Sequence, residues 1–387
     1  MPLHIATFEQ IRAGKTTDIY FERTQRILEA RGQNPRVRAE FAAKALPGAW
    51  PWAVLAGLDE CLAVLQGRRV TVRSMAEGTV FRPLQPVLEI EGPYLEFGLL
   101  ETAVLGLLCQ ATGVATAAAR CKRLAGDRLV LSFGARRLHP AVTPMVERAA
   151  YLGGCDGVSS IAAAELIQRD PMGTIPHALV LLLGDTVEAV RAFDQVIEPE
   201  TARVALIDTF QDEKFEALRV AEALGDALAA VRLDTPSSRR GNFLELLREV
   251  RWELDLRGYR HVRIYVSGGI GEDEIRELAE VADGFGVGSA ISAAPIVDFS
   301  MDIVEVEGRP LAKRGKWSGA KQVWRCHQCG GDIVLPLAEE GSACSCGGGR
   351  EPLLEPVFTE GRMAAPPPAP QAIRERTLAQ VAQLDLS

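Results

Sequence analysis

The stretch YVSGGIGEDEIRELAEVADGFGVGS, Tyr265–Ser289, places glycine-rich turns on both sides of one short helical segment. Each turn directly follows a short apolar run of the length of a buried strand. The order strand, turn, helix, strand and turn predicts parallel strands that are joined by a helical crossover. We therefore expect two neighbouring strands whose carboxyl ends both carry accessible backbone.

The same alternation begins at about residue 128. Amphipathic segments such as 186–197, 212–224 and 242–258 separate six short apolar runs, which are 128–133, 155–160, 203–210, 228–234, 262–269 and 283–289. Because six runs are clear, with at most one more, we expect an α/β fold built on an irregular, incomplete barrel rather than a regular eightfold one. An open, doubly wound sheet is the alternative.

Polar and glycine residues gather where these runs end. They are Phe133 to Arg137, Asp156 and Gly157, Asp208 and Thr209, Arg232 and Asp234, Ser267 to Gly269, and Gly286 to Ser289. In βα barrels the active site forms at the carboxyl ends of the strands. Glycine lets a phosphate approach backbone N–H groups closely. The last two turns therefore predict a phosphate site, although either could be an ordinary tight turn.

Ionisable side chains near these ends suit an anionic substrate. The donors for phosphate or carboxylate are Arg136, Arg137, His139 and Arg232. Asp208 and Asp234 could hold sugar hydroxyls, bind Mg²⁺ or stabilise a developing cation; helix caps or ion pairs are the alternative. His177 could act as acid, base or nucleophile, or be structural. Tyr20 could stack on a flat ring or lie in the core.

Composition limits the broad class. The chain has 387 residues, of which 47% are hydrophobic and 24% charged, enough for two or three domains. The net charge of −8 argues against a general binder of nucleic acid or membrane surfaces. The first residues lack the apolar core of a signal peptide, and we expect no apolar run long enough to span a bilayer. These features predict a cytoplasmic protein.

The eight cysteines fall into two groups. Four are scattered among apolar neighbours and are expected to be buried hydrophobes: Cys61, Cys109, Cys121 and Cys155. The others form a C-x-x-C and a C-x-C pair, both followed by glycines, and predict a structural Zn²⁺ site: Cys326, Cys329, Cys344 and Cys346. His327 is an alternative ligand, and four free thiols are the other reading. Residues 363–371 are a proline-rich linker before a tail helix that we expect to dock back.

Eight segments occur in an order that resembles nicotinate phosphoribosyltransferase, in the short subgroup with a C-terminal zinc knuckle. They are TTDIYF, SFGARRLHP, GGCDGVSS, MGTIPHAL, LIDTFQDE, VRLDTPSSRRGNF, YVSGGI and FGVGSAIS. The resemblance covers about residues 15–350. It implies an enzyme of NAD salvage that forms nicotinate mononucleotide and pyrophosphate from nicotinate and phosphoribosyl pyrophosphate, with Mg²⁺ and coupling to ATP hydrolysis.

The resemblance also implies an architecture and an assembly. The expected parts are an α/β sandwich domain in residues 1–115, the barrel in 116–295, a return to the sandwich in 296–322, and the zinc knuckle, linker and tail helix in 323–387. Members of this family form homodimers or higher homo-oligomers with active sites shared between subunits. Dimer and hexamer stay open for this chain.

Site roles follow from the matched segments. Tyr20 would stack on nicotinate from the neighbouring subunit, opposite Phe133. The other implied contacts are Arg136, Arg137 and His139 to phosphoribosyl pyrophosphate; Arg232 and the backbone around Thr174 to the nicotinate carboxylate; Asp208 and Asp234 to ribose hydroxyls, directly or through Mg²⁺; and Gly268, Gly269, Gly288 and Ser289 to the 5′-phosphate. His177 matches the histidine that ATP phosphorylates.

One departure and three alternatives accompany the resemblance. Longer relatives follow the Leu-Asp pair with Ser-Gly-Asp, whereas this chain reads LDTPSSRRGNF, which leaves the metal placement and the ATP coupling open. Quinolinate is one alternative substrate. Nicotinamide is another, with Asp156 facing the amide. A non-catalytic zinc-bearing scaffold or nucleic-acid binder is the alternative from another class.

Overall fold

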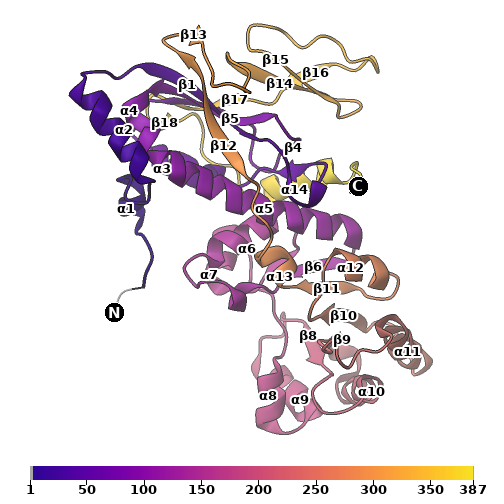
Figure 1. The fold of residues 1–387 in the computed structure, drawn as a ribbon. Coiled ribbons are helices and arrows are strands. Elements are labelled where there is room, and N and C mark those ends of the chain that lie inside the picture. The colour runs from indigo at the N-terminus through magenta and orange to yellow at the C-terminus, as the bar shows by residue number, and fades with distance from the viewer. Residues whose placement is uncertain (1–2, 387) are drawn as a thin grey trace. The chain divides into compact units, whose positions relative to one another are not determined.

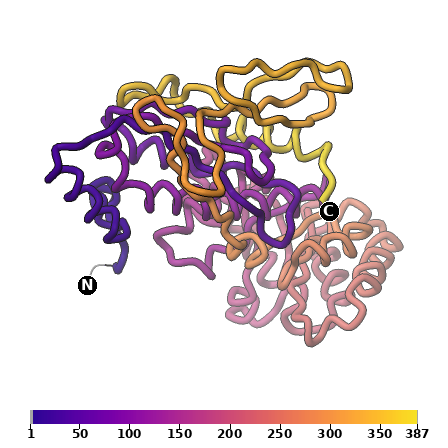
Figure 2. The backbone as a smooth tube through the Cα atoms, turned by 45° about the horizontal axis from the view of Figure 1, so that its top comes forward, coloured from indigo at the N-terminus to yellow at the C-terminus, as the bar shows by residue number. Residues whose placement is uncertain are grey.

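The computed structural model describes residues 3–386, and the chain divides into two compact units. The first unit runs to Thr116 and resumes at Pro295, and the second comprises Ala117–Ala294. The second unit is therefore one continuous insertion. The return of the chain to the first unit can be followed from indigo to yellow in Figure 2.

A seven-stranded antiparallel sheet organises the first unit in the order β13-β12-β1-β5-β3-β17-β18 (Figure 1). Its strands are β1 (Arg36–Ala43), β3 (Thr71–Ser74), β5 (Pro86–Pro93), β12 (Phe299–Val306), β13 (Arg309–Pro310), β17 (Glu355–Thr359) and β18 (Arg362–Met363). A separate pair is formed by β2 (Ala53–Val54) and β4 (Val80–Phe81). The helices before the insertion are α1 (Phe8–Arg12), α2 (Ile19–Ala30), α3 (Leu58–Leu65) and α4 (Tyr94–Phe97), with 3-10 turns η1 (Pro47–Ala49) and η2 (Gly98–Leu100). The long helix α5 (Glu101–Ala125) begins in the first unit and ends in the second.

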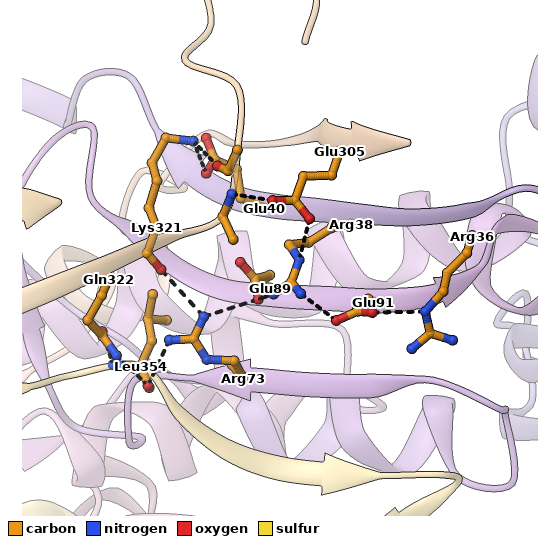
Figure 3. Close-up of polar contacts among 12 residues, drawn as sticks. Arg36, Arg38, Glu40, Arg73, Glu89, Glu91, Glu305, Lys321, Gln322 and Leu354 are labelled. Carbon is orange, nitrogen blue, oxygen red and sulfur yellow. Dashed lines mark hydrogen bonds and ion pairs between the residues drawn. The ribbon is translucent and has the colours of Figure 1, made fainter. Parts of the chain in front are cut away.

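The two faces of this sheet differ because successive residues of a strand point to opposite sides. Phe41, Leu88 and Ile90 lie on one face, where they are almost completely buried in the apolar core of the unit. The residues next to them in sequence, such as Glu40 and Glu89, lie on the other face. That second face carries a network of charged groups (Figure 3).

The charged face is built from paired groups. Arg38 donates to Glu89 at 2.7 Å and to Glu305 at 3.0 Å, and Lys321 donates to Glu40 at 2.8 Å. Glu89 is 2% exposed and Lys321 is 7% exposed. A buried charge is costly unless it is paired, so these contacts fix which strands lie together.

One helical stretch, Tyr94–Ala125, is long and apolar enough to cross a membrane by length and composition alone, so the expectation that no run reaches that length is wrong. Within its most apolar 18 residues, 56% are buried inside the protein. The hydroxyls of Thr112 and Thr116 accept hydrogen bonds from the N–H groups of Ala56 and Val54 at 3.2 and 2.9 Å. The helix thus makes the contacts of a core helix.

The C-terminal segment adds a small sheet and a helix to the first unit. The sheet has the order β15-β14-β16 and consists of β14 (Lys321–Cys326), β15 (Asp332–Pro336) and β16 (Arg350–Pro352); the helix is α14 (Pro370–Val381). Gly78 has a φ of +83°, and a Cβ there would lie 2.8 Å from Ile373 and from Thr377. Gln380 donates to the Gly78 carbonyl at 3.1 Å. The tail helix therefore docks where glycine leaves room.

Six parallel strands form the second unit, in the order β7-β6-β11-β10-β9-β8. They are β6 (Leu129–Ser132), β7 (Gly157–Val158), β8 (Arg203–Leu206), β9 (Leu228–Leu233), β10 (Arg263–Ser267) and β11 (Gly284–Val287). Chain order runs around this sheet, and β7 and β8 are its two open edges. The expected incomplete α/β barrel is confirmed, and the doubly wound alternative is not what forms.

Helices join the strands of this unit. They are α6 (Thr143–Leu152), α7 (Ile161–Ile167), α8 (His177–Leu183), α9 (Thr186–Val196), α10 (Glu213–Leu224), α11 (Phe243–Leu256), α12 (Glu272–Leu278) and α13 (Ser289–Ser292), with 3-10 turns η3 (Ala135–Arg137) and η4 (Gly225–Ala227). Asp185, Asp212 and Asn242 cap α9, α10 and α11 by accepting hydrogen bonds from N–H groups of the first turn. These caps explain why the helices begin close to the residues expected from sequence.

Candidate active site

A cavity of about 790 Å³ opens within the second unit. Its lining includes Phe133, Arg136, Arg137, Ser159, Thr174, His177, Arg232, Asp234, Ser267, Gly268, Gly269, Glu274, Gly286, Gly288 and Ser289. Most of these residues follow the carboxyl ends of β6, β7, β9, β10 and β11. The parallel strands thus bring together side chains that are far apart in sequence, at the end where βα barrels place their active sites.

His177 stands between two carboxylates. Its Nε2 lies 3.5 Å from Asp234 Oδ2 and 3.8 Å from Asp208 Oδ2, and its Nδ1 lies 3.0 Å from Thr209 Oγ1. Asp234 lines the cavity, whereas the Asp208 side chain is only 2% exposed and reaches the lining through His177. The cavity wall therefore carries one accessible carboxylate, an imidazole, and a second carboxylate behind it.

Burial raises the pKa of Asp208, although the neighbouring His177 acts in the opposite direction. Within the part of the chain that the structure describes, Asp208 Oδ1 has no hydrogen-bond partner. Buried carboxylate oxygens without a donor are uncommon in folded proteins. One oxygen of the Asp208 carboxylate thus lacks a donor among the described residues, in a side chain that lies behind His177.

Arg232 lies beside an aromatic ring in the cavity wall. Its guanidinium carbon lies 5.8 Å from the centroid of the Phe133 ring, and its Nη2 donates to the Ile175 carbonyl at 3.3 Å. Burial lowers the pKa of Arg232, and its Nε has no partner among the described residues. A Cβ at Gly286 would lie 2.4 Å from the Phe133 ring, so glycine is required there. The pair offers a guanidinium and an aromatic surface side by side, which suits a flat ring that carries an anionic group.

The two glycine-rich turns are adjacent because β10 pairs with β11, with Ser267 opposite Gly286. Gly268 and Gly269 have φ values of +79° and +70°, which residues other than glycine rarely adopt. Gly288 and Ser289 follow β11 and line the same cavity. Both turns therefore present backbone to one space, as the sequence pattern predicted.

Two acidic residues that the sequence analysis did not single out shape this space. Both oxygens of the buried Glu147 accept hydrogen bonds from the backbone and hydroxyl groups of Ser159 and Ser160, at 2.5 to 3.0 Å. Glu274 accepts from the N–H of Gly271 at 2.9 Å. A glutamate within the apolar run VERAAYL was the available signal for Glu147, because such a residue needs buried partners.

Three residues from the sequence analysis lie elsewhere. His139 is exposed and absent from the cavity lining, and its Nδ1 accepts from the N–H of Ala141 at 3.2 Å. Tyr20 belongs to α2 in the first unit and is 56% exposed. Asp156 precedes β7 instead of following it, and it pairs with Lys122 at 2.9 Å. The suggestion that Asp156 faces a substrate amide is therefore wrong.

The second cysteine group is a candidate metal centre. All four Sγ atoms of Cys326, Cys329, Cys344 and Cys346 lie within 4.8 Å of one another, and two of the pairs are 3.5 and 3.6 Å apart. Tetrahedral thiolates around Zn²⁺ would be about 3.8 Å apart, given Zn–S bonds of about 2.3 Å. The ring of His327 instead faces Glu351 at 3.7 Å. The thiolates thus fit a metal such as zinc without the histidine.

Comparison with known proteins places this architecture. Profiles described as quinolinate phosphoribosyl transferase, N-terminal and C-terminal domains, match residues 18–112 and 114–302. Nicotinate phosphoribosyltransferase pncB2 of Mycobacterium tuberculosis is 33% identical over 321 residues, which cover 79% of this chain and 67% of that protein. The chain belongs to the type II phosphoribosyltransferase family. The resemblance read from the eight sequence segments is thereby confirmed.

Solved structures agree with this family. The crystal structure of nicotinate-nucleotide pyrophosphorylase from Pyrococcus furiosus is 51% identical and matches with a TM-score of 0.97 over the whole of both chains. Human nicotinic acid phosphoribosyltransferase matches with a TM-score of 0.77 over 95% of this chain and 94% of that one. At 21% identity, the human protein bears on the fold alone.

Proposed function

We propose that this phosphoribosyltransferase joins nicotinate to phosphoribosyl pyrophosphate and releases nicotinate mononucleotide and pyrophosphate, as a step of NAD salvage in the cytoplasm. The observation that carries the proposal is one cavity that holds the Arg232–Phe133 pair, the Asp234 carboxylate and two glycine turns. These features match the three parts of the reaction: a flat acid, a sugar carbon that becomes cationic, and phosphates.

The residues would divide the work as follows. Arg232 and Phe133 hold the nicotinate ring through its carboxylate and its face, with Thr174 at the same wall. Arg136 and Arg137 face the pyrophosphate, and the two glycine turns take the 5′-phosphate. Asp234 stabilises the oxocarbenium-like sugar as the bond to pyrophosphate breaks. The pyridine nitrogen carries no proton at neutral pH, so its attack needs positioning rather than a base.

Mg²⁺ is part of the proposal. Mg²⁺ prefers oxygen ligands, and the carboxylates of Asp208 and Asp234 would supply them. The Oδ1 atom of Asp208, which has no hydrogen-bond partner among the described residues, is consistent with such a role. When bound, the ion would offset the charge of the leaving pyrophosphate.

Coupling to ATP is a separate part. The resemblance assigns the phosphoryl acceptor to His177, whose Nε2 faces both carboxylates and whose Nδ1 meets Thr209. Product formation with and without ATP tests this part. A His177→Ala variant should lose any stimulation by ATP while it keeps a basal rate.

Two other pyridine substrates are tested in the same assay. Quinolinate would need further cations for its second carboxylate. Nicotinamide lacks the anionic group that Arg232 would bind. In a competition among the three pyridines, nicotinate should have the largest kcat/KM. Faster turnover of either competitor would refute the assignment.

Zinc and assembly complete the proposal. We expect one structural Zn²⁺ per chain on the four cysteines, and a homodimer or larger homo-oligomer in which Tyr20 of one copy stacks on the nicotinate of another. Metal analysis should give one zinc for the wild type and for His327→Ala, and none for Cys344→Ser. A folded wild type without zinc would remove the metal claim.

A non-catalytic scaffold is the remaining alternative, and ligand binding separates it from an enzyme. Phosphoribosyl pyrophosphate with Mg²⁺ should raise the melting temperature of the protein, because a ligand that binds only the folded state stabilises it. An unchanged melting temperature at millimolar ligand would favour the scaffold.

A further inference from the structure

Arg240 connects the loops that follow two neighbouring strands of the barrel. Its Nε donates to the Thr235 carbonyl at 2.6 Å, and its Nη2 donates to the Ser267 carbonyl at 3.0 Å and to the Gly268 carbonyl. The guanidinium carbon lies 4.6 Å from the centroid of the Phe243 ring at the start of α11. One side chain is therefore held on an aromatic face while it binds backbone at the ends of both β9 and β10.

These contacts determine which way the first glycine turn points its donors. The described peptides are all trans, and a planar trans peptide directs its N–H opposite to its C=O. The carbonyls of Ser267 and Gly268 are turned toward Arg240, so the N–H groups of Gly268 and Gly269 are turned away from it. Both glycines line the cavity, whereas Arg240 does not. The two N–H groups therefore face the cavity.

The turn is also held from the side of Asp234. The Ser267 hydroxyl donates to Asp234 Oδ1 at 2.8 Å. A Cβ on Gly268 would lie 2.8 Å from the same oxygen and 3.3 Å from Arg240 Nη2. The backbone is thus enclosed between a carboxylate and a guanidinium and has little freedom to rotate its peptides.

We propose that Arg240 is a positioning residue for phosphate binding, which rests on the proposed phosphoribosyl substrate. It fixes the amides of Gly268 and Gly269 as a pair of donors to the sugar phosphate without touching that phosphate. A cationic donor on the carbonyl side also polarises each peptide, which strengthens the N–H on the other side as a donor. The basic loop after Asp234 thereby acts through the backbone of the next turn.

The test compares Arg240→Ala with Arg239→Ala, which removes the same charge one residue earlier from an exposed side chain. The KM for phosphoribosyl pyrophosphate should rise about tenfold or more in Arg240→Ala, the equivalent of one lost charged hydrogen bond, while the KM for nicotinate changes less than twofold. Arg239→Ala should change both less than twofold. Arg240→Lys should raise the KM several-fold, because one ammonium group cannot span three carbonyls on two loops.

A binding measurement separates this inference from the proposed function. Ribose 5-phosphate carries the sugar phosphate but cannot react, and it should raise the melting temperature of wild type and Arg239→Ala but not of Arg240→Ala. If the wild type made no nucleotide, yet ribose 5-phosphate still raised its melting temperature and not that of Arg240→Ala, the proposed function would fail and the role of Arg240 would stand. Equal effects of Arg239→Ala and Arg240→Ala would overturn the role of Arg240, and so would equal rises in the KM values for phosphoribosyl pyrophosphate and for nicotinate. A wild-type KM for phosphoribosyl pyrophosphate in both Arg240→Lys and Arg240→Ala would overturn it as well.

Discussion

The charged sheet face of the first unit and the cavity wall of the second unit differ in how their buried charges are paired. In the first unit, Arg38 bonds to three glutamates and Lys321 bonds to Glu40, so each charge of the sheet face has a counterpart (Figure 3). In the second unit, Asp208 Oδ1 and Arg232 Nε have no partner among the described residues. Paired buried charges specify how strands pack, whereas unpaired ones raise the free energy of the empty site and are satisfied when a ligand binds.

The largest expected effect comes from a substitution in the cavity wall of the second unit. Asp234→Asn should lower kcat/KM by about 10²-fold or more, because it removes the charge that stabilises the cationic sugar. Its melting temperature should stay near that of the wild type. Asp226→Asn is the matched control, since Asp226 is exposed in η4 at the opposite end of β9. Steady-state kinetics with thermal melts measure both, and full activity in Asp234→Asn would mean that the site is misplaced.

A stability measurement tests the paired charges on the sheet face of the first unit. Arg38→Met should lower the free energy of unfolding by about 3 kcal/mol, because it leaves the buried Glu89 and its neighbours short of a partner. Arg36→Met should lower it by about 1 kcal/mol or less, since the Arg36 side chain is 50% exposed in its pair with Glu91. Urea unfolding monitored by circular dichroism compares them. Similar losses in the two variants would show that burial does not decide the value of these pairs.

The smallest effect concerns a single acid in the first unit. Burial, and next the charge of Asp302, raise the pKa of Glu101 to about 7 from an ordinary value of 4.5. The folded state then keeps a proton that the unfolded chain loses, so this contribution to stability is full below about pH 4.5 and is lost as pH rises to about 7. Glu101→Gln should therefore be about 1 to 2 kcal/mol more stable than the wild type at pH 8, but not at pH 4.5. Parallel pH curves for the two proteins would contradict this assignment.

The sequence predicted what depends on local pattern. The six strands of the barrel, the two glycine turns and the knuckle cysteines are marked by apolar runs or by spacing within a few residues. The error at Asp156 is one of strand boundary, since a two-residue β7 leaves it before the strand and not after it. The expectation that no apolar run could span a bilayer failed because the helical stretch Tyr94–Ala125 is long and apolar enough by length and composition.

Other features depend on contacts that no local pattern carries. Arg240 acts on backbone 27 and 28 residues away, and Glu147 binds serines 12 and 13 residues away. Asp208 lies behind His177, whereas Asp234 lines the cavity. These placements required the folded barrel.

The proposed phosphoribosyl transfer is tested most directly by product formation with the zinc-loaded protein, Mg²⁺, phosphoribosyl pyrophosphate and one pyridine substrate at a time. We expect the wild type to form nicotinate mononucleotide and an equal amount of pyrophosphate from nicotinate, and we expect Asp234→Asn to lose this product formation. No nucleotide from nicotinate, quinolinate or nicotinamide, with or without ATP, from a folded wild-type protein would contradict it.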